Sequence, residues 1–241
     1  MVERILRIPR RRHRRYGLSA ECTTTEAELA AEAKAYFERD GYECWAEVRH
    51  IDLVARKDGV PLGIEVKKQF NPHLVAQALQ AQSYCGAAFM VIPRVADVAT
   101  KYCVEAVVEK SGLGCLEIWD WGYATPTTPR FEAKLLAAPT RRLHDGTDAI
   151  KKLLVPETKN WTEAGKPSCR AVTDFRLTAL RIRNYVQDHV GCTVQEVLAE
   201  VPVHWRKSGA KSNLLKMLDK GAIDGVVAVA RDGMETTLVP A

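Results

Sequence analysis

Apolar residues recur every three or four positions after Thr24, which predicts a helix as far as the Asp40-Gly41 turn. Three short stretches beyond it favour β-strands, because apolar and β-branched residues dominate them and Asp58-Gly59 forms a turn between the last two. Helices and strands then alternate. The predicted elements are helices at 24–40, 72–85 and 97–111 and strands at 42–48, 51–57, 61–68, 87–92 and 115–121. This α-β-β-β-α-β-α-β order predicts an α/β sandwich domain over 21–121.

The end of the chain has a different pattern, in which helices come first and strands follow. The pattern predicts helices at 175–190, 193–201 and 208–220 and strands at 225–231 and 234–240. Asp232-Gly233, between the two strands, is a strong hairpin signal. Three helices followed by a β-hairpin are typical of a winged helix-turn-helix module, which we expect over 171–241. Residues 122–170 are rich in Thr, Pro and charge, and we interpret them as a connector with one short helix around 148–155.

Charge is distributed unevenly along the 241 residues, whose formal net charge is +5. Residues 1–20 contain seven basic and one acidic residue, whereas 21–121 contain ten basic and sixteen acidic residues. We expect 1–20 to form a basic arm that either contacts a polyanion or remains a solvated tail. Its candidate phosphate contacts are Arg10, Arg11, Arg12, Arg14 and Arg15.

The amino-acid composition indicates a globular protein. Hydrophobic residues make up 46% and charged residues 27%, which is typical of a globular chain with a sizeable core. The longest apolar runs are far shorter than the ~20 residues of a membrane span, so no membrane partner is expected. Seven dispersed cysteines form no C-x-x-C pair and favour a reducing compartment, so we predict a cytoplasmic or nucleoid-associated protein. We expect no organic cofactor.

A hairpin register is predicted to bring two carboxylates together. If Asp58-Gly59 is a two-residue hairpin loop, cross-strand partners have residue numbers that sum to 117, so Asp52 faces Glu65. Side chains in such pairs are about 5 Å apart, where like charges destabilise a sheet unless a cation lies between them. Mg²⁺ prefers oxygen ligands of this kind. The register requires Pro61 to take a non-hydrogen-bonded position, and a longer loop would shift the pairing.

Three more polar side chains are predicted to face this region. Strand alternation places Lys67 on the same face as Glu65. Glu26 lies three residues before Leu29 and continues the apolar stripe of the first helix, and Gln77 falls on the sheet-facing stripe of helix 72–85. An inward charge or amide needs a partner. The ordinary alternatives are a helix-dipole acid for Glu26, a surface amide for Gln77 and a surface ion pair for Glu65 and Lys67.

This set of residues resembles the PD-(D/E)XK nuclease superfamily, whose members have the restriction-endonuclease-like fold. The matching motifs are Ile51-Asp52 and Glu65-Val66-Lys67, with Glu26 and Gln77 at auxiliary positions, and the resemblance covers 21–121, nearly half of the chain. Ile51 stands in place of the name-giving proline, a substitution that the superfamily tolerates widely. The resemblance implies a restriction-endonuclease-like α-β-β-β-α-β core, which the predicted element order matches.

The resemblance also implies a metal-dependent deoxyribonuclease, and we expect an endonuclease. Asp52, Glu65 and the backbone carbonyl of Val66 would hold Mg²⁺ or Mn²⁺, and Glu26 could serve a second metal. Lys67 would orient the attacking water. The implied catalytic residues are Asp52, Glu65, Lys67, Glu26 and Gln77. Many members of the superfamily dimerise to cut both strands, so a homodimer is expected on this resemblance alone.

The winged-helix prediction adds a second group of candidate DNA contacts on and before the third helix of that module. They are Arg206, Lys207, Lys211, Ser212 and Lys216. Winged helices also bind proteins, so two alternatives to the nuclease remain open. One is a non-catalytic DNA-binding regulator whose nuclease-like domain is a relic. The other is an assembly module in a larger nucleic-acid complex.

Overall fold

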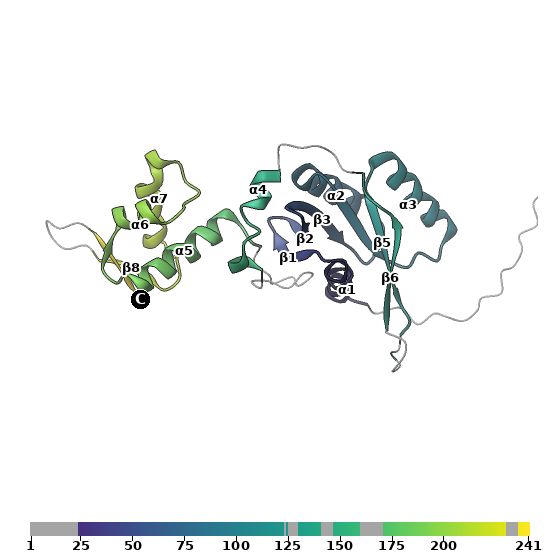
Figure 1. Cartoon of the computed structure of the whole chain (residues 1–241), viewed down its shortest axis with the longest axis horizontal. Coiled ribbons are helices and arrows are strands. Elements are labelled where there is room, and N and C mark those ends of the chain that lie inside the picture. The colour runs from purple at the N-terminus through teal and green to yellow at the C-terminus, as the bar shows by residue number, and fades with distance from the viewer. Residues whose placement is uncertain (1–23, 123, 125–129, 141–146, 160–170, 230–235) are drawn as a thin grey trace, which may run out of the picture.

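The computed structural model describes residues 24–122, 124, 130–140, 147–159, 171–229 and 236–241. The arginines of the basic arm and the Asp232-Gly233 turn lie outside the described residues. The chain has a mixed α/β structure with one six-stranded and one three-stranded sheet (Figure 1). Among the described residues, the search for helices long and apolar enough to cross a bilayer finds none.

The large sheet follows the chain order, β1-β2-β3-β4-β5-β6. Its strands are β1 (Glu43–Val48), β2 (Ile51–Lys57), β3 (Val60–Val66), β4 (Ala88–Pro93), β5 (Gly114–Asp120) and β6 (Phe131–Ala137). The first three form an antiparallel meander, β4 and β5 run parallel to β3, and β6 returns antiparallel to β5. β3, β4 and β5 run in one direction and end at Val66, Pro93 and Asp120, so the ends of these strands lie along one edge of the sheet. The antiparallel strand β2 begins at the same edge.

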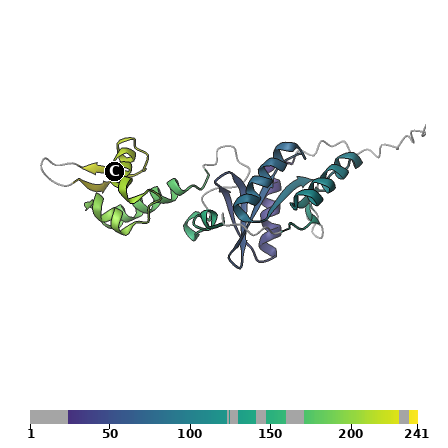
Figure 2. The same ribbon diagram turned by 90° about the horizontal axis from the view of Figure 1, so that it is seen from above.

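Helices cover the two faces of this sheet separately (Figures 1 and 2). α1 (Glu26–Arg39) packs its apolar stripe on one face, where it meets residues such as Leu53 and Ile64. α2 (Pro72–Cys85) and α3 (Val98–Ser111) contribute to the core on the other face. The predicted helix starts are confirmed by their caps: Thr25 forms a capping box with Glu28, and Asn71 accepts the N–H of Leu74 just before Pro72.

The β2–β3 hairpin has the predicted loop and register. Asp58 and Gly59 both have positive φ angles, 53° and 74°, as a two-residue type I′ turn requires. The recorded pairs run from Lys57–Val60 to Leu53–Ile64, and every pair of residue numbers sums to 117. In this alternation Pro61, opposite Arg56, takes the non-hydrogen-bonded position that its missing N–H requires.

The stretch 122–170 contains more structure than the connector interpretation predicted. β6 lies within it and completes the edge of the sheet beside β5. The short helix α4 (Thr147–Lys151) replaces the helix predicted around 148–155, and a 3₁₀ turn η1 (Pro156–Thr158) follows it. Ile150, Leu153 and Leu154 are buried in the core beside α2. The sequence did not signal β6 because its residues FEAKLLA face solvent at many positions and have low β-propensity.

The remaining described residues form a helical unit with its own core. Its elements are α5 (Asp174–Asp188), β7 (Cys192–Thr193), α6 (Val194–Glu200), η2 (Lys207–Gly209), α7 (Ala210–Asp219), β8 (Val226–Val229) and β9 (Thr237–Pro240). The small sheet has the order β7-β9-β8, with both pairs antiparallel. A β-bridge between Val48 and Val172 and an ion pair of 3.0 Å between Arg49 and Asp174 join the start of this unit to the end of β1.

Candidate active site

Asp52 lies at the point where β2 and β3 separate. Its Oδ2 accepts the backbone N–H of Val66 at 2.8 Å, so this carboxylate continues the hairpin where the recorded strand pairs end. One further step in the same register places Asp52 opposite Glu65, as predicted. Leu53 and Ile64 face α1, so by strand alternation Asp52 and Glu65 both face α2.

Glu65 is a buried acid, with only 1% of its surface exposed. Burial raises its pKa to about 9, the charge of Asp52 and a side-chain hydrogen bond with Asp52 raise it further, and the ammonium of Lys67 partly offsets these effects. Its Oε2 is buried and accepts no hydrogen bond. A carboxylate in this position is costly when ionised unless a positive group reaches the free oxygen.

Lys67 gathers the other polar groups at the end of β3. Its Nζ lies 3.0 Å from the carbonyl oxygen of Val66, 3.5 Å from Asp52 Oδ2 and 3.7 Å from Glu26 Oε2. The carbonyl of Val66, predicted as a metal ligand, therefore has the Lys67 ammonium as its donor. Glu26 is the first residue of α1, which covers the opposite face of the sheet. Lys67 contacts both Glu26 and Asp52 because it lies at the end of β3.

Gln77 is placed beside this group by close packing between β3 and α2. A Cβ on Gly63 would lie 2.8 Å from the Cβ of Ala81, so the strand and the helix touch there. Glu65 lies two residues after Gly63, which is about 6.6 Å along β3. Gln77 lies four residues before Ala81, which is about 6 Å along α2. The two steps bring Gln77 to the level of Glu65. The Gln77 Oε1 is buried and, like Glu65 Oε2, has no hydrogen-bond partner.

A third carboxylate, missed at the sequence level, lies in the same row. The pairs of β1 and β2 have residue numbers that sum to 99, and this register places Glu47 opposite Asp52. The charge of Glu47 contributes to the raised pKa of Glu65. Glu47 has a positive φ of 52°, at an irregular end of β1. The sequence contained the information to predict this pairing. If Arg49-His50 is a two-residue hairpin loop, the same register rule pairs Glu47 with Asp52.

These groups fit a cation. Two buried oxygens, Glu65 Oε2 and Gln77 Oε1, lack donors, and the neighbouring oxygens of Asp52 and Val66 are hard ligands of the kind that Mg²⁺ binds. Across the described residues, a search for three or more His, Cys, Asp or Glu side chains placed to hold a metal ion finds none. A cation here would therefore depend on two carboxylates together with backbone or amide oxygens.

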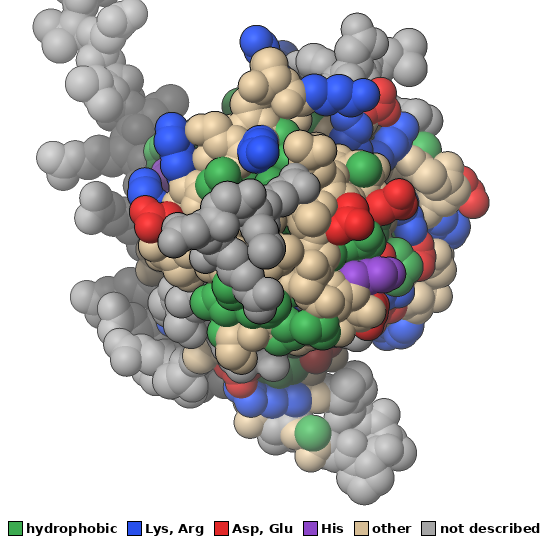
Figure 3. All heavy atoms as spheres, turned by 90° about the vertical axis from the view of Figure 1, so that its left-hand side faces the viewer, with side chains coloured by type: hydrophobic (Ala, Val, Ile, Leu, Met, Phe, Trp, Pro, Cys, Tyr) green, Lys and Arg blue, Asp and Glu red, His purple; other side chains and the backbone are tan. Residues whose placement is uncertain are grey.

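The basic candidates of the C-terminal unit lie on solvent-facing positions. Arg206, Lys207, Lys211, Ser212 and Lys216 are all exposed, whereas Leu214 and Leu218 point into the core. Lys and Arg side chains are spread over the visible face of this unit, with Asp and Glu side chains between them (Figure 3). These residues are thus accessible to solvent, and among the described residues none of them contacts Asp52 or Glu65.

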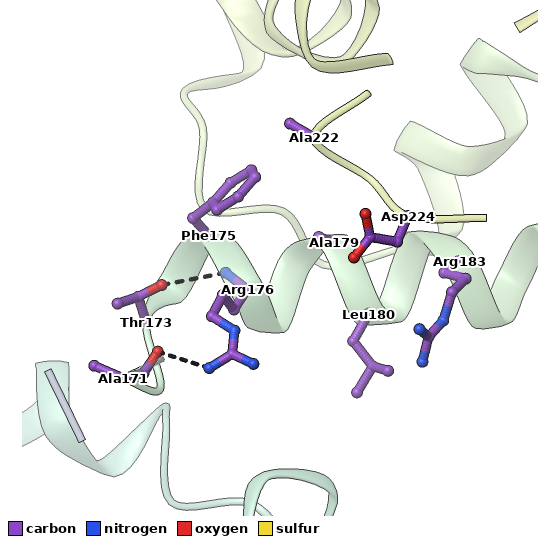
Figure 4. A pocket seen from close by; sticks show the side chains of 9 residues that line it. All are labelled: Ala171, Thr173, Phe175, Arg176, Ala179, Leu180, Arg183, Ala222 and Asp224. Carbon is purple, nitrogen blue, oxygen red and sulfur yellow. Dashed lines mark hydrogen bonds between the residues drawn. The ribbon is translucent and has the colours of Figure 1, made fainter. Parts of the chain in front are cut away.

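A cavity of about 550 Å³ lies along α5, away from these acids. Phe175, Arg176, Leu180 and Arg183 of α5 line it, together with Asp224 from the segment before β8 (Figure 4). None of the residues predicted from the sequence as catalytic lines it. The Arg176 guanidinium already donates to the carbonyl of Ala171 at 3.2 Å, which indicates a role in fixing the start of α5.

Comparison of the chain with protein-family models, with curated proteins and with solved structures finds no match in any of the three.

Proposed function

We propose that the protein is a metal-dependent DNA nuclease of the PD-(D/E)XK type, acting as an endonuclease. The observation that carries the proposal is Glu65, a buried acid with a free oxygen that lies in register with Asp52 and beside Lys67. A purely structural acid in such a place would be expected to have its oxygens satisfied. Perturbed acids of this kind cluster at functional sites.

The restriction-endonuclease-like core is supported by the arrangement of its elements. The described chain has the order α1-β1-β2-β3-α2-β4, with an antiparallel meander followed by a parallel strand. The candidate residues lie on β2, on β3 and at the start of α1, where the resemblance puts the acids and the lysine. The approach of Asp52 and Glu26 to within 3.5–3.7 Å of the Lys67 ammonium adds to the motif spacing.

In the proposed mechanism, Asp52, Glu65 and the Val66 carbonyl hold Mg²⁺ or Mn²⁺. When bound, the ion supplies positive charge that polarises the scissile phosphate and makes a water molecule more acidic. Lys67 orients that water and stabilises charge that develops on the phosphate. Glu26 holds Lys67 toward the site, and Gln77 fixes the position of Glu65 or of the water. The Lys67 ammonium lies 3.0 Å from the Val66 carbonyl oxygen and 3.5 Å from Asp52 Oδ2, within reach of both proposed ligands.

The C-terminal unit is proposed to hold DNA as a winged helix. Three helices with a small sheet of order β7-β9-β8 support this proposal, and in such a module α7 would be the helix that enters the groove. Exposed Lys211, Ser212 and Lys216 on α7, with Arg206 and Lys207 before it, supply phosphate contacts. The basic arm adds contacts that depend on salt.

A cytoplasmic or nucleoid-associated location is part of the same proposal. Cys44, Cys85, Cys103, Cys115 and Cys192, the cysteines of the described residues, are all free thiols. Burial raises the pKa of Cys44, Cys85 and Cys115 to about 12, so these thiols stay protonated and unreactive in the core. Free thiols are typical of proteins in a reducing compartment.

The test is cleavage of supercoiled, linear, single-stranded and branched DNA with Mg²⁺, with Mn²⁺ and with EDTA. We expect metal-dependent cleavage that is lost in Asp52→Asn and Lys67→Ala and kept in Asp148→Asn, an exposed acid on α4. Cleavage that persists in either site variant would overturn the proposal. DNA binding without cleavage would favour the regulator, and neither binding nor cleavage would favour the assembly module.

A further inference from the structure

Aromatic and basic side chains form a cluster at the edge of the sheet where β4 and β5 end. The rings of Trp119 and Trp121 lie edge to face, with centroids 5.5 Å apart. The guanidinium carbon of Arg94 lies 4.1 Å from the centroid of Trp119, and Lys134 Nζ lies 5.1 Å from it. We call these four residues the tryptophan cluster.

Buried groups fix the position of this cluster. Trp119 Nε1 donates to Glu117 Oε2 at 3.0 Å, and Glu117 Oε1 accepts the N–H of Val95 at 3.1 Å. Glu117 is only 4% exposed, so a buried carboxylate orients the indole. The backbone N–H of Trp121 donates to the carbonyl of Arg130 at 2.9 Å. The two rings are therefore held in place before any ligand arrives.

Three members of the tryptophan cluster, Trp121, Arg94 and Lys134, are exposed to solvent and can contact a ligand. Trp121 is 39% exposed, which is high for so large an aromatic residue. Arg94 and Lys134 are exposed, and within the described ranges neither forms an ion pair with a carboxylate. An exposed indole next to a ring that carries two exposed cations has the chemistry that binds a nucleotide, since a base stacks on the exposed ring and its phosphate meets the cations.

The cluster lies on the same edge of the sheet as the candidate active site. The backbone N–H of Lys67 donates to the carbonyl of Val91, and the next residue on β4, Ile92, pairs with Glu117 on β5. Lys67 and Glu117 thus lie two strands apart, roughly 10 Å, and Trp119 is two residues further along β5. Trp119 and Glu117 share the α2 face with Glu65, because Cys115 in the same alternation packs there.

We propose that Trp121, supported by Trp119, Arg94 and Lys134, is a stacking site for an unpaired base, so the protein takes nucleic acid with a single-stranded segment. The base that stacks lies a short distance along the strand from the phosphate at Lys67. A paired base inside a duplex cannot offer its face to Trp121. The link to cleavage rests on the proposed nuclease function, whereas the binding itself does not.

The test is the affinity of the full chain for a fluorescein-labelled ten-nucleotide oligo(dT), measured by fluorescence anisotropy with EDTA and about 0.2 M NaCl. Salt at that level weakens phosphate contacts elsewhere on the chain. We expect Trp121→Ala to bind the oligonucleotide about 5- to 150-fold more weakly, the loss expected for one stacked base. Trp121→Phe should retain most of the affinity. Tyr102→Ala, a control on α3 at a residue that is 74% exposed, should bind like the unchanged protein.

The outcomes separate this proposal from the nuclease. A loss in Trp121→Ala that is confined to the single strand and absent for a ten-base-pair duplex supports the stacking site. Equal affinity of Trp121→Ala and the unchanged protein, or an equal loss on both ligands, overturns it. Failure of metal-dependent cleavage by the unchanged protein, with an intact Trp121 effect on binding, would overturn only the nuclease. The reverse result would overturn only the stacking site.

Discussion

The carboxylate of Asp52 accepts the backbone N–H of Val66 at 2.8 Å, and this bond joins the start of β2 to the end of β3. The same carboxylate lies 3.5 Å from the ammonium of Lys67. One side chain therefore has two roles, a structural one as acceptor and a proposed chemical one as anion. Substitutions that keep the acceptor but remove the charge separate the two.

Asp52→Asn should leave stability nearly unchanged, because the amide oxygen still accepts the Val66 N–H. Asp52→Ala should lower the free energy of unfolding by about 1–3 kcal/mol, since it leaves a buried donor unsatisfied. Urea unfolding of the three proteins measures the difference. We expect both variants to lose metal-dependent cleavage. Equal stability of Asp52→Ala and Asp52→Asn would show that the bond to Val66 contributes nothing.

Glu65→Gln should raise the melting temperature in metal-free buffer at pH 8, because the Glu65 carboxyl, with a folded pKa of about 9, must take up a proton on folding and an amide need not. Each kcal/mol gained raises the midpoint by about 2–4 °C in a chain of this size. The unchanged protein should gain stability with added Mg²⁺ and the variant should gain little, since a ligand that binds only the folded state stabilises it. Differential scanning fluorimetry with and without EDTA measures both effects. An unchanged Mg²⁺ response in Glu65→Gln would contradict the assignment.

The raised pKa of Glu65 also predicts how stability depends on pH. The ordinary pKa of the carboxyl is 4.5 and its folded value is about 9, so the folded chain holds this proton more tightly than the unfolded chain between those limits. Stability in metal-free buffer should therefore fall as pH rises through this window. Subtracting the pH profile of Glu65→Gln isolates the contribution of this group. A difference profile that is flat between pH 5 and pH 9 would exclude the raised pKa.

The packing of Gly63 on Ala81 predicts a steric effect at the level of the site. Gly63→Ala should destabilise the protein by about 1–3 kcal/mol, because its new Cβ would lie 2.8 Å from that of Ala81. The double variant Gly63→Ala with Ala81→Gly removes the clash and should recover part of the loss, although glycine in α2 costs about 1 kcal/mol. A double-mutant cycle from urea unfolding gives the coupling. Additive losses would show that the two residues do not meet.

The basic arm predicts a salt-dependent contribution to DNA affinity. Removal of residues 1–16 deletes the seven arginines of the arm, which neutralise phosphates and release counterions. The shortened protein should bind duplex DNA more weakly at low salt, and its affinity should change less steeply with salt concentration. Anisotropy titrations from about 50 to 200 mM NaCl measure the slope. Identical slopes for the full and shortened chains would remove the arm from DNA binding.

Rules that depend on neighbouring residues predicted most helices and strands of the described chain. The cap at Thr193 follows from residue type alone, since short oxygen-bearing side chains satisfy the first free N–H groups, whereas residue type left Thr23, Thr24 and Thr25 equivalent and the structure selects Thr25. The Asp58-Gly59 turn fixed the β2–β3 register, and with it the pairing of Asp52 with Glu65, because a two-residue loop leaves only one alignment. β6 was missed because an exposed edge strand lacks the apolar alternation that marks a half-buried one.

The sequence by itself determined the α/β order, the β2–β3 hairpin and the candidate acids Glu26, Asp52 and Glu65, because turns, caps and strand alternation depend on neighbouring residues. Only the tertiary structure decided how those acids meet. Lys67 joins Glu26 from α1 to Asp52 from β2, and the packing of Gly63 on Ala81 brings α2 over Glu65. Burial, which leaves Glu65 Oε2 without a donor and raises its pKa to about 9, arises from elements far apart in the chain. No local pattern encodes that desolvation, since it depends on what packs around the carboxyl group.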